Sequence, residues 1–508
     1  MLKRHHKLIF GAILIFLFAF SLRVITLNVM GRTWDENEYV TDGYNMDELL
    51  IKGNFSSSYF YTTYDHPPLA KYIYGIPAHL DLKSLDKSGN PTFHYNLTYS
   101  RLLSSIFGSL SAVLVFLMAW EYVSPFVGSL SGIIFSALPV FIGLSQLVTT
   151  ESILMFLFTG AIYGFIKLID RISPRKVVFV GVLAGLAVLA KQSNLLLFPL
   201  FIFIYLIWYL NFGKQHKLKF LNKSLYSILW ITLIAIITFM ALWPMAFFHL
   251  NVINRIDSRL WLTFSPPPVI FWGKLILSPV IYYITIFFIT TPLLVIVAAL
   301  IGLKAIDNKK NWILYAIVFW FCFPFIQSFY PFRANGIRYI VEIYAPLSII
   351  AGIGIGFIVE KLKVRKNLKL GVLLLTVMYV LVVDAQIQPY YLDYFNALVG
   401  GIQSVYKNQY FEIGWWGEGL GEAGNYLKRV ANKGSTVGLA VSPALAFPQL
   451  NDLKVSTYSA NLKFDYVVVN YFHVLRDSFN DSQIKKNYKL IHQVMAGGAP
   501  LVDIYSSK

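Results

Sequence analysis

The stretch WDENEYV at residues 34–40, together with YDHPPLAKY at residues 64–72, is the part of the sequence that decides the fold. It follows directly on a long apolar run at residues 8–30. The adjacent carboxylates Asp35 and Glu36 therefore stand just beyond a segment long enough to cross a membrane. We expect the rest of the chain to form a membrane scaffold that holds this polar stretch at a lipid surface.

The composition supports a membrane protein. Of the 508 residues, 56% are hydrophobic and only 14% are charged, whereas soluble domains carry about 25% charged residues. Apolar runs of about 20 residues recur along the chain, and each can cross a hydrocarbon core of about 30 Å. The sequence therefore predicts a polytopic α-helical membrane protein.

Eleven such runs are expected. After the first, they lie at about 100–120, 125–144, 150–169, 177–192, 194–210, 225–248, 280–303, 312–330, 339–358 and 370–388. The basic clusters, such as DRISPRK at 170–176 and EKLKVRKNLK at 360–369, all fall on one side of this pattern. Because cytoplasmic loops carry the excess of Lys and Arg, we expect a cytoplasmic N-terminus and an integral protein of the cell membrane. The first run exceeds the 7–15 residues of a signal-peptide core, so a retained helix is favoured over a cleaved signal.

The charge and cysteine content exclude other classes. The formal net charge is +17, but the cations lie in short clusters between apolar runs, so no nucleic-acid partner is expected and the partners should include membrane lipids. Cys322 is the one cysteine of the sequence, which excludes an intrachain disulfide and a zinc site built on cysteines.

The last 120 residues change character. Apolar segments shorten to the length of a β-strand, as in TVGLAV at 436–441, DYVVVNY at 465–471 and LVDIYS at 501–506. A helix is expected around 418–430. The sequence thus predicts two domains: a transmembrane catalytic module at residues 1–388, whose first outer loop (31–99) carries the site, and a small extracytoplasmic α/β domain at 389–508.

Asp35 and Glu36 are the candidate catalytic residues. Trp34 is an interfacial anchor, which places the carboxylates near lipid headgroups. A carboxylate there can take a proton from a hydroxyl group as its oxygen attacks a sugar carbon. One carboxylate suffices if the leaving group is a phosphate, unlike glycoside hydrolysis, which needs a second acid. The alternative is an ordinary polar loop start.

Four other ionisable residues are expected near the same surface. Arg101 opens the second span and Arg338 precedes the tenth, where either can stabilise a phosphate. Snorkelling at a helix end, or for Arg338 an ion pair with Glu342, explains them as well. Glu151 and Lys191 stand at the outer ends of spans, where they serve either function or a salt bridge inside the bundle.

The motif HPPL at 66–69 is a stiff turn, because prolines fix the backbone. It points Asp65, His66 and Lys71 in defined directions, so these three are candidate substrate contacts. Asp65 and His66 could alternatively join a site for a divalent metal.

WDEN followed by DHPPLAKY resembles the protein O-mannosyltransferases, glycosyltransferase family 39, and the wider group of GT-C enzymes that use polyprenyl-phosphate sugars. RLLSSIFGSLS at 101–111 and RYIVEIYAP at 338–346 are similar to further family segments. YYLDYFNALVGG at 390–401 and WGEGLGEAGNYL at 416–427 look like the tail of prokaryotic members.

The resemblance implies an inverting transfer of a sugar, commonly mannose, from a polyprenyl or dolichyl phosphate. It makes Asp35 the base or acceptor-orienting carboxylate and Glu36 its support or a substrate contact. Arg101 becomes a phosphate contact, and His66 and Lys71 fall in the matched motif. Most members of the mannosyltransferase branch work without a metal, and some relatives bind one.

The acceptor stays open. The loop at 249–279 is too short for the β-trefoil module of eukaryotic members, so Ser or Thr of a protein, a glycan and a lipid are all acceptors to consider. A transporter or flippase of lipid-linked sugars is the alternative from another class. An oligosaccharyltransferase acting on Asn is a further one, because GWWGEG at 414–419 is close to, but does not match, a known acceptor-reading motif.

Overall fold

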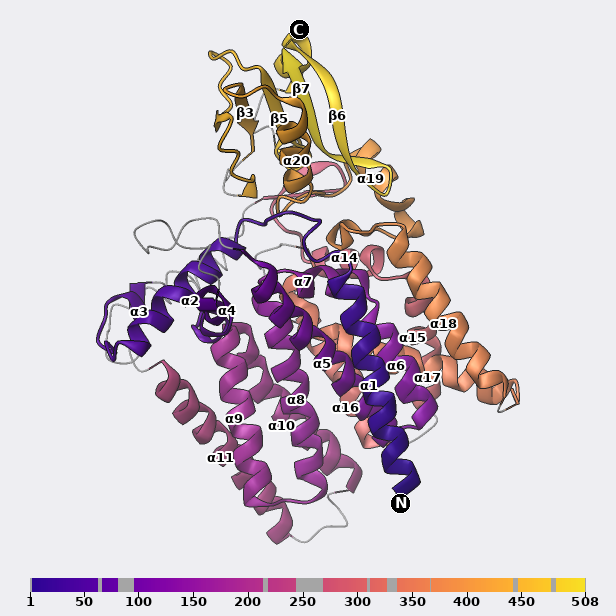
Figure 1. Ribbon diagram of the computed structural model, residues 1–508. Coiled ribbons are helices and arrows are strands. Elements are labelled where there is room, and N and C mark those ends of the chain that lie inside the picture. The colour runs from indigo at the N-terminus through magenta and orange to yellow at the C-terminus, as the bar shows by residue number, and fades with distance from the viewer. Residues whose placement is uncertain are drawn as a thin grey trace.

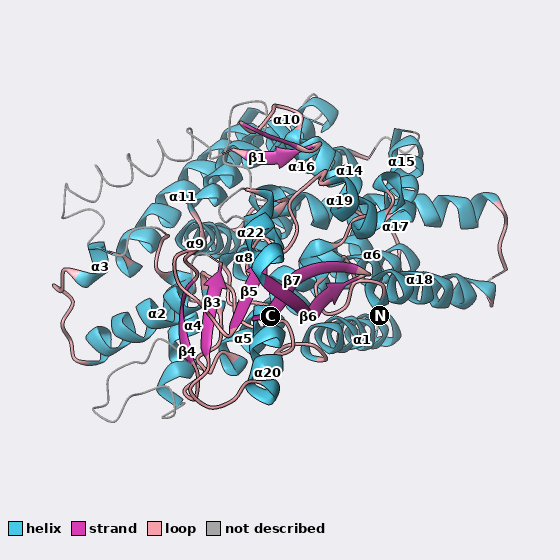
Figure 2. Cartoon of the chain, turned by 90° about the horizontal axis from the view of Figure 1, so that it is seen from above, coloured by secondary structure: helices cyan, strands magenta, loops and turns pink. Residues whose placement is uncertain are grey.

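The computed structural model describes residues 2–62, 66–80, 96–212, 218–243, 268–307, 311–326, 336–365, 367–441, 446–476 and 481–507. Long helices form one bundle, and a smaller sheet domain lies at the end of the bundle opposite the N-terminus (Figure 1). Seen from above, the sheet lies over the bundle with α2 on one side and α18 on the other (Figure 2).

The bundle consists of helices that coincide with the apolar runs. They are α1 (Leu2–Val24), α5 (Thr98–Tyr122), α6 (Pro125–Ser136), α7 (Pro139–Gln146), α8 (Thr150–Asp170), α9 (Pro174–Ala190), α10 (Leu197–Phe212), α11 (Leu218–Leu242), α14 (Tyr282–Thr290), α15 (Leu293–Asp307), α16 (Trp312–Ile326), α17 (Tyr344–Lys361) and α18 (Leu368–Ala385). Within the described residues, seven helices are long and apolar enough to cross a membrane, or up to nine if two bent pairs each count as one span. The polytopic α-helical class is confirmed, and the count of eleven stays a prediction.

Two of the expected spans are bent instead of straight. α6 and α7 meet at 60°, and α14 and α15 meet at 111°. Pro139 and Pro292 stand at these breaks, where the missing N–H and the proline ring interrupt a helix. The first bend directs α7 so that Val148, two residues after this helix, reaches Glu36 through its backbone amide.

The predicted outer loop at 31–99 is largely helical where it is described. It forms α2 (Glu36–Ile51), α3 (Tyr59–Thr62) and α4 (Leu69–Leu80). α2 and α4 cross at Gly43 and Gly75, where a Cβ on Gly43 would lie 2.7 Å from the backbone nitrogen of Gly75. The absence of side chains at this crossing lets the two backbones touch, which fixes the direction of α2.

The sheet domain contains five strands in the order β4-β3-β5-β7-β6. β3 lies parallel to β4 and β5, whereas β7 lies antiparallel to β5 and β6. The strands are β3 (Thr436–Ala440), β4 (Lys454–Thr457), β5 (Tyr466–Asn470), β6 (Tyr488–Ala496) and β7 (Ala499–Ser507), and α20 (Leu420–Val430) packs beside them. The α/β character expected of the tail is therefore present, and β4 and β6 are strands that the sequence pattern did not reveal.

Short elements lie between the longer ones, both within the two parts and where the parts meet. They are the hairpin β1 (Val269–Phe271) and β2 (Lys274–Ile276), the 3-10 turns η2 (Gln192–Leu196), η5 (Arg338–Ile343), η6 (Tyr391–Asp393) and η7 (Ala397–Val399), and the helices α19 (Gly401–Asn408), α21 (Tyr471–Leu475) and α22 (Asp481–Asn487). The sheet domain also touches the first polar stretch directly. A Cβ on Gly31 would lie 2.7 Å from the backbone nitrogen of Gly421, so the two chain segments meet backbone to backbone.

Candidate active site

Glu36 is the first residue of α2, and it is completely buried. Arg101 donates from Nε to Oε1 at 2.8 Å and from Nη2 to Oε2 at 2.7 Å. The backbone amides of Thr33 and Val148 each donate to one oxygen at 3.0 Å. Burial acts to raise the pKa of Glu36, but the Arg101 charge and these donors outweigh it, so the pKa lies below its ordinary value. Glu36 is therefore a fully paired carboxylate.

Arg101 ties together the polar stretch that precedes α2. Besides Glu36, its guanidinium donates to the carbonyl oxygen of Leu27 at 2.8 Å and to that of Gly31. Its side chain is 3% exposed. These contacts hold residues 27–36 against α5, so Arg101 shapes the site from beneath.

Asp35 lies in a different environment, although it is the neighbouring residue. Its side chain is 37% exposed and does not cap α2. Oδ2 accepts a hydrogen bond from the indole Nε1 of Trp416 at 3.2 Å and lies 3.5 Å from Nη1 of Arg338. Both donors act on one oxygen, and no described residue donates a hydrogen bond to the other.

Arg338 links Asp35 to a second, buried carboxylate. Its Nε donates to Oε1 of Glu151 at 3.0 Å, and Nζ of Lys191 donates to the same oxygen at 2.8 Å. Glu151 and Lys191 therefore form the buried salt bridge considered from the sequence. In the described part of the chain, the ion pairs of Arg338 go to Glu151 and Asp35 rather than to Glu342.

The second motif, HPPLAK, lies on the α4 side of α2. Lys71 is completely buried, and its Nζ is 2.7 Å from Oδ2 of Asp42, whose Oδ1 accepts from Tyr59 at 2.8 Å. The ring of His66 stacks on Tyr39 at 5.8 Å between centroids. Asp65 lies outside the described residues. Among the residues that the structure does describe, no group of three or more His, Cys, Asp or Glu side chains could hold a metal ion.

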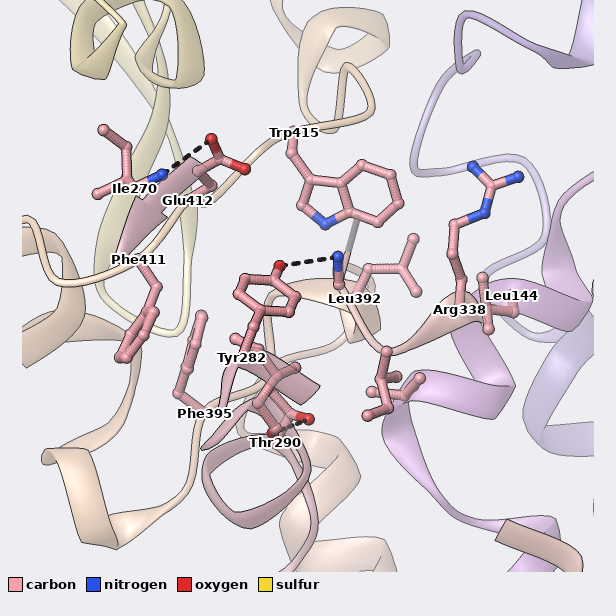
Figure 3. A pocket seen from close by; sticks show the side chains of 14 residues that line it. Leu144, Ile270, Tyr282, Thr290, Arg338, Leu392, Phe395, Phe411, Glu412 and Trp415 are labelled. Carbon is pink, nitrogen blue, oxygen red and sulfur yellow. Dashed lines mark hydrogen bonds between the residues drawn. The ribbon is translucent and has the colours of Figure 1, made fainter. Parts of the chain in front are cut away.

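A pocket with a mainly apolar lining lies beside Arg338, and its bounds contain about 590 Å³ of space when open solvent is included. Figure 3 shows Trp415 between Glu412 and Arg338. α7, β1, α14, η5 and the segment that leads into the sheet domain all contribute to its wall. The lining residues are Val140, Leu144, Ile270, Tyr282, Ile286, Thr290, Gly336, Ile337, Arg338, Leu392, Phe395, Phe411, Glu412 and Trp415. The pocket thus combines an apolar wall with a guanidinium group at one side.

Comparisons with known proteins agree with this architecture. Residues 13–254 match the family model described as dolichyl-phosphate-mannose-protein mannosyltransferase. A region of 137 residues is 29% identical to dolichyl-phosphate-mannose–protein mannosyltransferase 1 of Saccharomyces cerevisiae, and it covers 25% of this chain and 16% of the yeast protein. The crystal structure of ArnT from Cupriavidus metallidurans bound to undecaprenyl phosphate superposes with a TM-score of 0.51 at 12% identity, over 97% of each chain. ArnT in the apo state gives a TM-score of 0.52 at 13% identity.

The whole chain has the GT-C fold, and residues 13–254, a little under half of it, resemble the mannosyltransferase family. The family match covers the N-terminal part of the bundle, which includes both motifs, and the ArnT likeness shows the fold of the whole chain. The match to the yeast mannosyltransferase spans about a sixth of that protein's length.

In this GT-C protein, the structure brings together only some of the residues singled out in the sequence. Asp35 and Arg338 meet, and Glu36 and Arg101 meet beneath them. Lys71 forms an ion pair with Asp42 and so supports α2 from its other side. The roles proposed for all of these residues stay predictions.

Trp416 contacts Asp35, and the sequence analysis did not assign it to the site. It lies 381 residues beyond Asp35 in the chain, so no local pattern joins them. One signal was available: GWWGEG carries Gly414, Gly417 and Gly419, and all three have positive φ, at 61°, 95° and 84°. Closely spaced glycines of this kind indicate a tightly shaped loop.

Proposed function

We propose that this protein transfers a sugar from a polyprenyl-phosphate donor to a hydroxyl acceptor. The observation that carries the proposal is the Asp35 carboxylate, partly open and 3.5 Å from Arg338. A general base needs a free carboxylate oxygen near the acceptor, and a departing phosphate needs a cation nearby. Asp35 and Arg338 supply these two groups side by side.

The reaction would proceed by direct displacement. The acceptor hydroxyl gives its proton to Asp35 as its oxygen attacks the anomeric carbon of the sugar. The bond from that carbon to the phosphate oxygen breaks, and the electron pair leaves with the lipid phosphate. Attack from the face opposite the phosphate inverts the anomeric configuration. Arg338 would stabilise the charge that grows on the phosphate, while its bond to Glu151 keeps the guanidinium in place.

The pocket beside Arg338 supports a lipid donor. Its wall is mainly aliphatic and aromatic, and Arg338 lines one side of it and lies 3.5 Å from the candidate base Asp35. We assign it to the start of the polyprenyl chain. Mannose as the sugar and a protein as the acceptor are favoured by the family description and by the name of the yeast relative. On such an acceptor, a Ser or Thr side chain would supply the hydroxyl group.

The domain division belongs to the same proposal. Residues 1–388 would form the catalytic membrane module, and residues 389–508 the extracytoplasmic domain. The basic clusters favour an N-terminus in the cytoplasm and the site on the outer face. One alternative is a transferase that acts on a glycan or a lipid. Another is a carrier of lipid-linked sugars, and the following experiment distinguishes these possibilities.

The test measures transfer from radiolabelled polyprenyl-phosphate mannose by purified wild type and Asp35→Asn, with Ser/Thr peptide, glycan and lipid acceptors in parallel. The loss of the base should lower turnover by roughly 10²–10⁴-fold, while donor binding persists. EDTA added to the wild type tests for a metal. If Asp35→Asn is as fast as wild type, the assignment of the base is wrong. If wild type binds the donor without transfer to any acceptor, a carrier becomes the better proposal.

A further inference from the structure

The loop GWWGEG, residues 414–419, connects the sheet domain to the candidate base. Trp416 is 1% exposed, and its indole Nε1 donates to Oδ2 of Asp35 at 3.2 Å. The preceding residue is also docked, because the indole Nε1 of Trp34 donates to the carbonyl oxygen of Trp415 at 3.1 Å. Two neighbouring positions of the loop are therefore bonded to two neighbouring positions of the WDEN stretch.

The same indole ring also contacts the candidate phosphate-binding cation. Cζ of Arg338 lies 4.3 Å from the centroid of the Trp416 ring. A guanidinium group over an indole face is an attractive cation–π contact. Trp416 thus touches both members of the Asp35–Arg338 pair, one through its N–H edge and the other through its face.

The sheet domain determines where this ring lies. Oδ1 of Asp393 accepts from the amide of Gly414 at 2.8 Å, and the Asn470 side-chain amide donates to the carbonyl oxygen of Gly414 at 3.3 Å. Oε2 of Glu418 accepts from the amide of Trp416 itself at 2.7 Å. All three side chains are buried, so the loop has little freedom to move away from Asp35.

Glycine is required for the loop to approach so closely. Gly417 has a φ of +95°, and a Cβ there would lie 2.9 Å from Cβ of Ala446 and 3.2 Å from the Trp34 ring. An L side chain would be strained by the backbone angle and crowded by both neighbours. The sequence around Trp416 is therefore built for contact with Trp34 and Asp35.

We propose that Trp416 is a positioning residue for the transfer reaction, holding the Asp35 carboxylate and the Arg338 guanidinium in their working geometry. This inference rests on the function proposed above. Because the hydrogen bonds of Asp35 recorded in the described chain both use Oδ2, Oδ1 is left to receive the acceptor's proton. The C-terminal domain thereby completes the active site instead of only flanking it.

The central variants are Trp416→Phe and Trp416→Tyr. Phenylalanine keeps an aromatic ring beside Arg338 but removes the N–H donor, and tyrosine restores a donor at the ring edge. Trp320→Phe is the matched control, because Trp320 is also fully buried, lies in α16 away from the site, and its Nε1 has no partner among the described residues. Each variant is purified as the full chain, its folding is checked by thermal melting, and its kcat and donor KM are measured.

Trp416→Phe should lower kcat by roughly 10- to 100-fold, because a misplaced base loses near-attack geometry, with the donor KM within about threefold of wild type. Arg338, the charged group that faces Asp35, is unchanged in every variant. Trp416→Tyr should recover part of the rate, and Trp320→Phe should match wild type.

A double-mutant cycle with Asp35→Asn shows whether Trp416 acts through the base. Trp416→Phe should change the residual rate of Asp35→Asn far less than it changes wild type. Equal effects in both backgrounds, or a loss in the donor KM as large as the loss in kcat, would overturn the positioning role. If Trp416→Phe does not fold, the same two tests apply to Trp416→Tyr. Wild type without transfer would instead refute the proposed function, whereas active wild type with an inactive Asp35→Asn and a normal Trp416→Phe would refute only this inference.

Discussion

Asp35 and Glu36 are consecutive carboxylates, yet their surroundings have almost nothing in common. Glu36 has no exposed surface and receives hydrogen bonds from Arg101 and two backbone amides. Asp35 is 37% exposed and receives its two recorded contacts on a single oxygen. A carboxylate saturated with donors holds structure together, because it has neither the space nor the basicity to take a substrate's proton. The comparison teaches that the number of donors, more than the position in a motif, separates a support from a base.

The largest effect is expected from Glu36→Gln, which tests whether Glu36 supports the structure while Asp35 acts as the base. Neutralising Glu36 leaves the guanidinium of Arg101 buried without its counter-charge, which should cost about 3–5 kcal/mol of stability. The measurement is the thermal melting of the purified protein in one detergent, with Asp35→Asn as the neighbouring control. Asp35→Asn should melt close to wild type while its turnover falls. A stable Glu36→Gln that has lost turnover as completely as Asp35→Asn would show that the two carboxylates share one role.

A smaller effect is expected from Arg338→Lys, which tests whether the cation beside Asp35 must be a guanidinium group. Lysine keeps the charge but lacks the planar fork that reaches Glu151 and Asp35 together. We expect kcat/KM for the donor to fall by roughly 10²-fold, within the range for loss of one preorganised donor. Arg23→Lys is the control, because Arg23 is equally buried near the end of a bundle helix and its recorded bonds go to Ala19, Ser136 and Ser145. If the folded Arg23→Lys loses as much activity, the effect reflects packing.

The smallest effect concerns Glu418, a third kind of carboxyl group. Burial raises its pKa from the ordinary 4.5 to about 7, and burial together with the nearby Glu418 charge raises that of Asp393. A raised folded-state pKa means that this contribution to stability is complete below about pH 4.5 and is lost as pH rises through about 7. Glu418→Gln should therefore raise the melting temperature, relative to wild type, more at pH 8.5 than at pH 5.5, by roughly 2–4 °C per kcal/mol. A pH-independent difference would contradict a protonated Glu418 in the folded protein.

The helices of the bundle were predictable because their signal is local. An apolar run of about 20 residues has few alternatives to a helix in a membrane, and each expected run contains a helix in the described residues. The bends at Pro139 and Pro292 changed the direction of two spans without changing their composition. The sequence did not predict the helices α2 and α4, because segments that are half polar lack the long apolar run that identifies a membrane helix. Their crossing depends on contact between Gly43 and Gly75, which are more than thirty residues apart in the chain.

The candidate site was predictable in its residue types but not in its pairings. The motif indicated Asp35 and Glu36 together, and only the approach of Arg101 and Val148 from other elements distinguishes them. The sequence identified Glu151 as an ionisable group at a helix end. Its contacts with Lys191 and Arg338 could not be predicted, because they depend on how three separate elements pack together. Trp416 could not be assigned at all, because its partner lies at the other end of the sequence.

The meeting of Gly31 with Gly421 has a consequence for how the protein is made. Gly31 is translated before most of the bundle helices of the described chain, and Gly421 is translated after them. Nascent chains can therefore enter the membrane while the carboxylate that we assign to catalysis still lacks its indole neighbour. We expect the enzyme to be inert throughout translation and to gain activity in one late step, when the sheet docks.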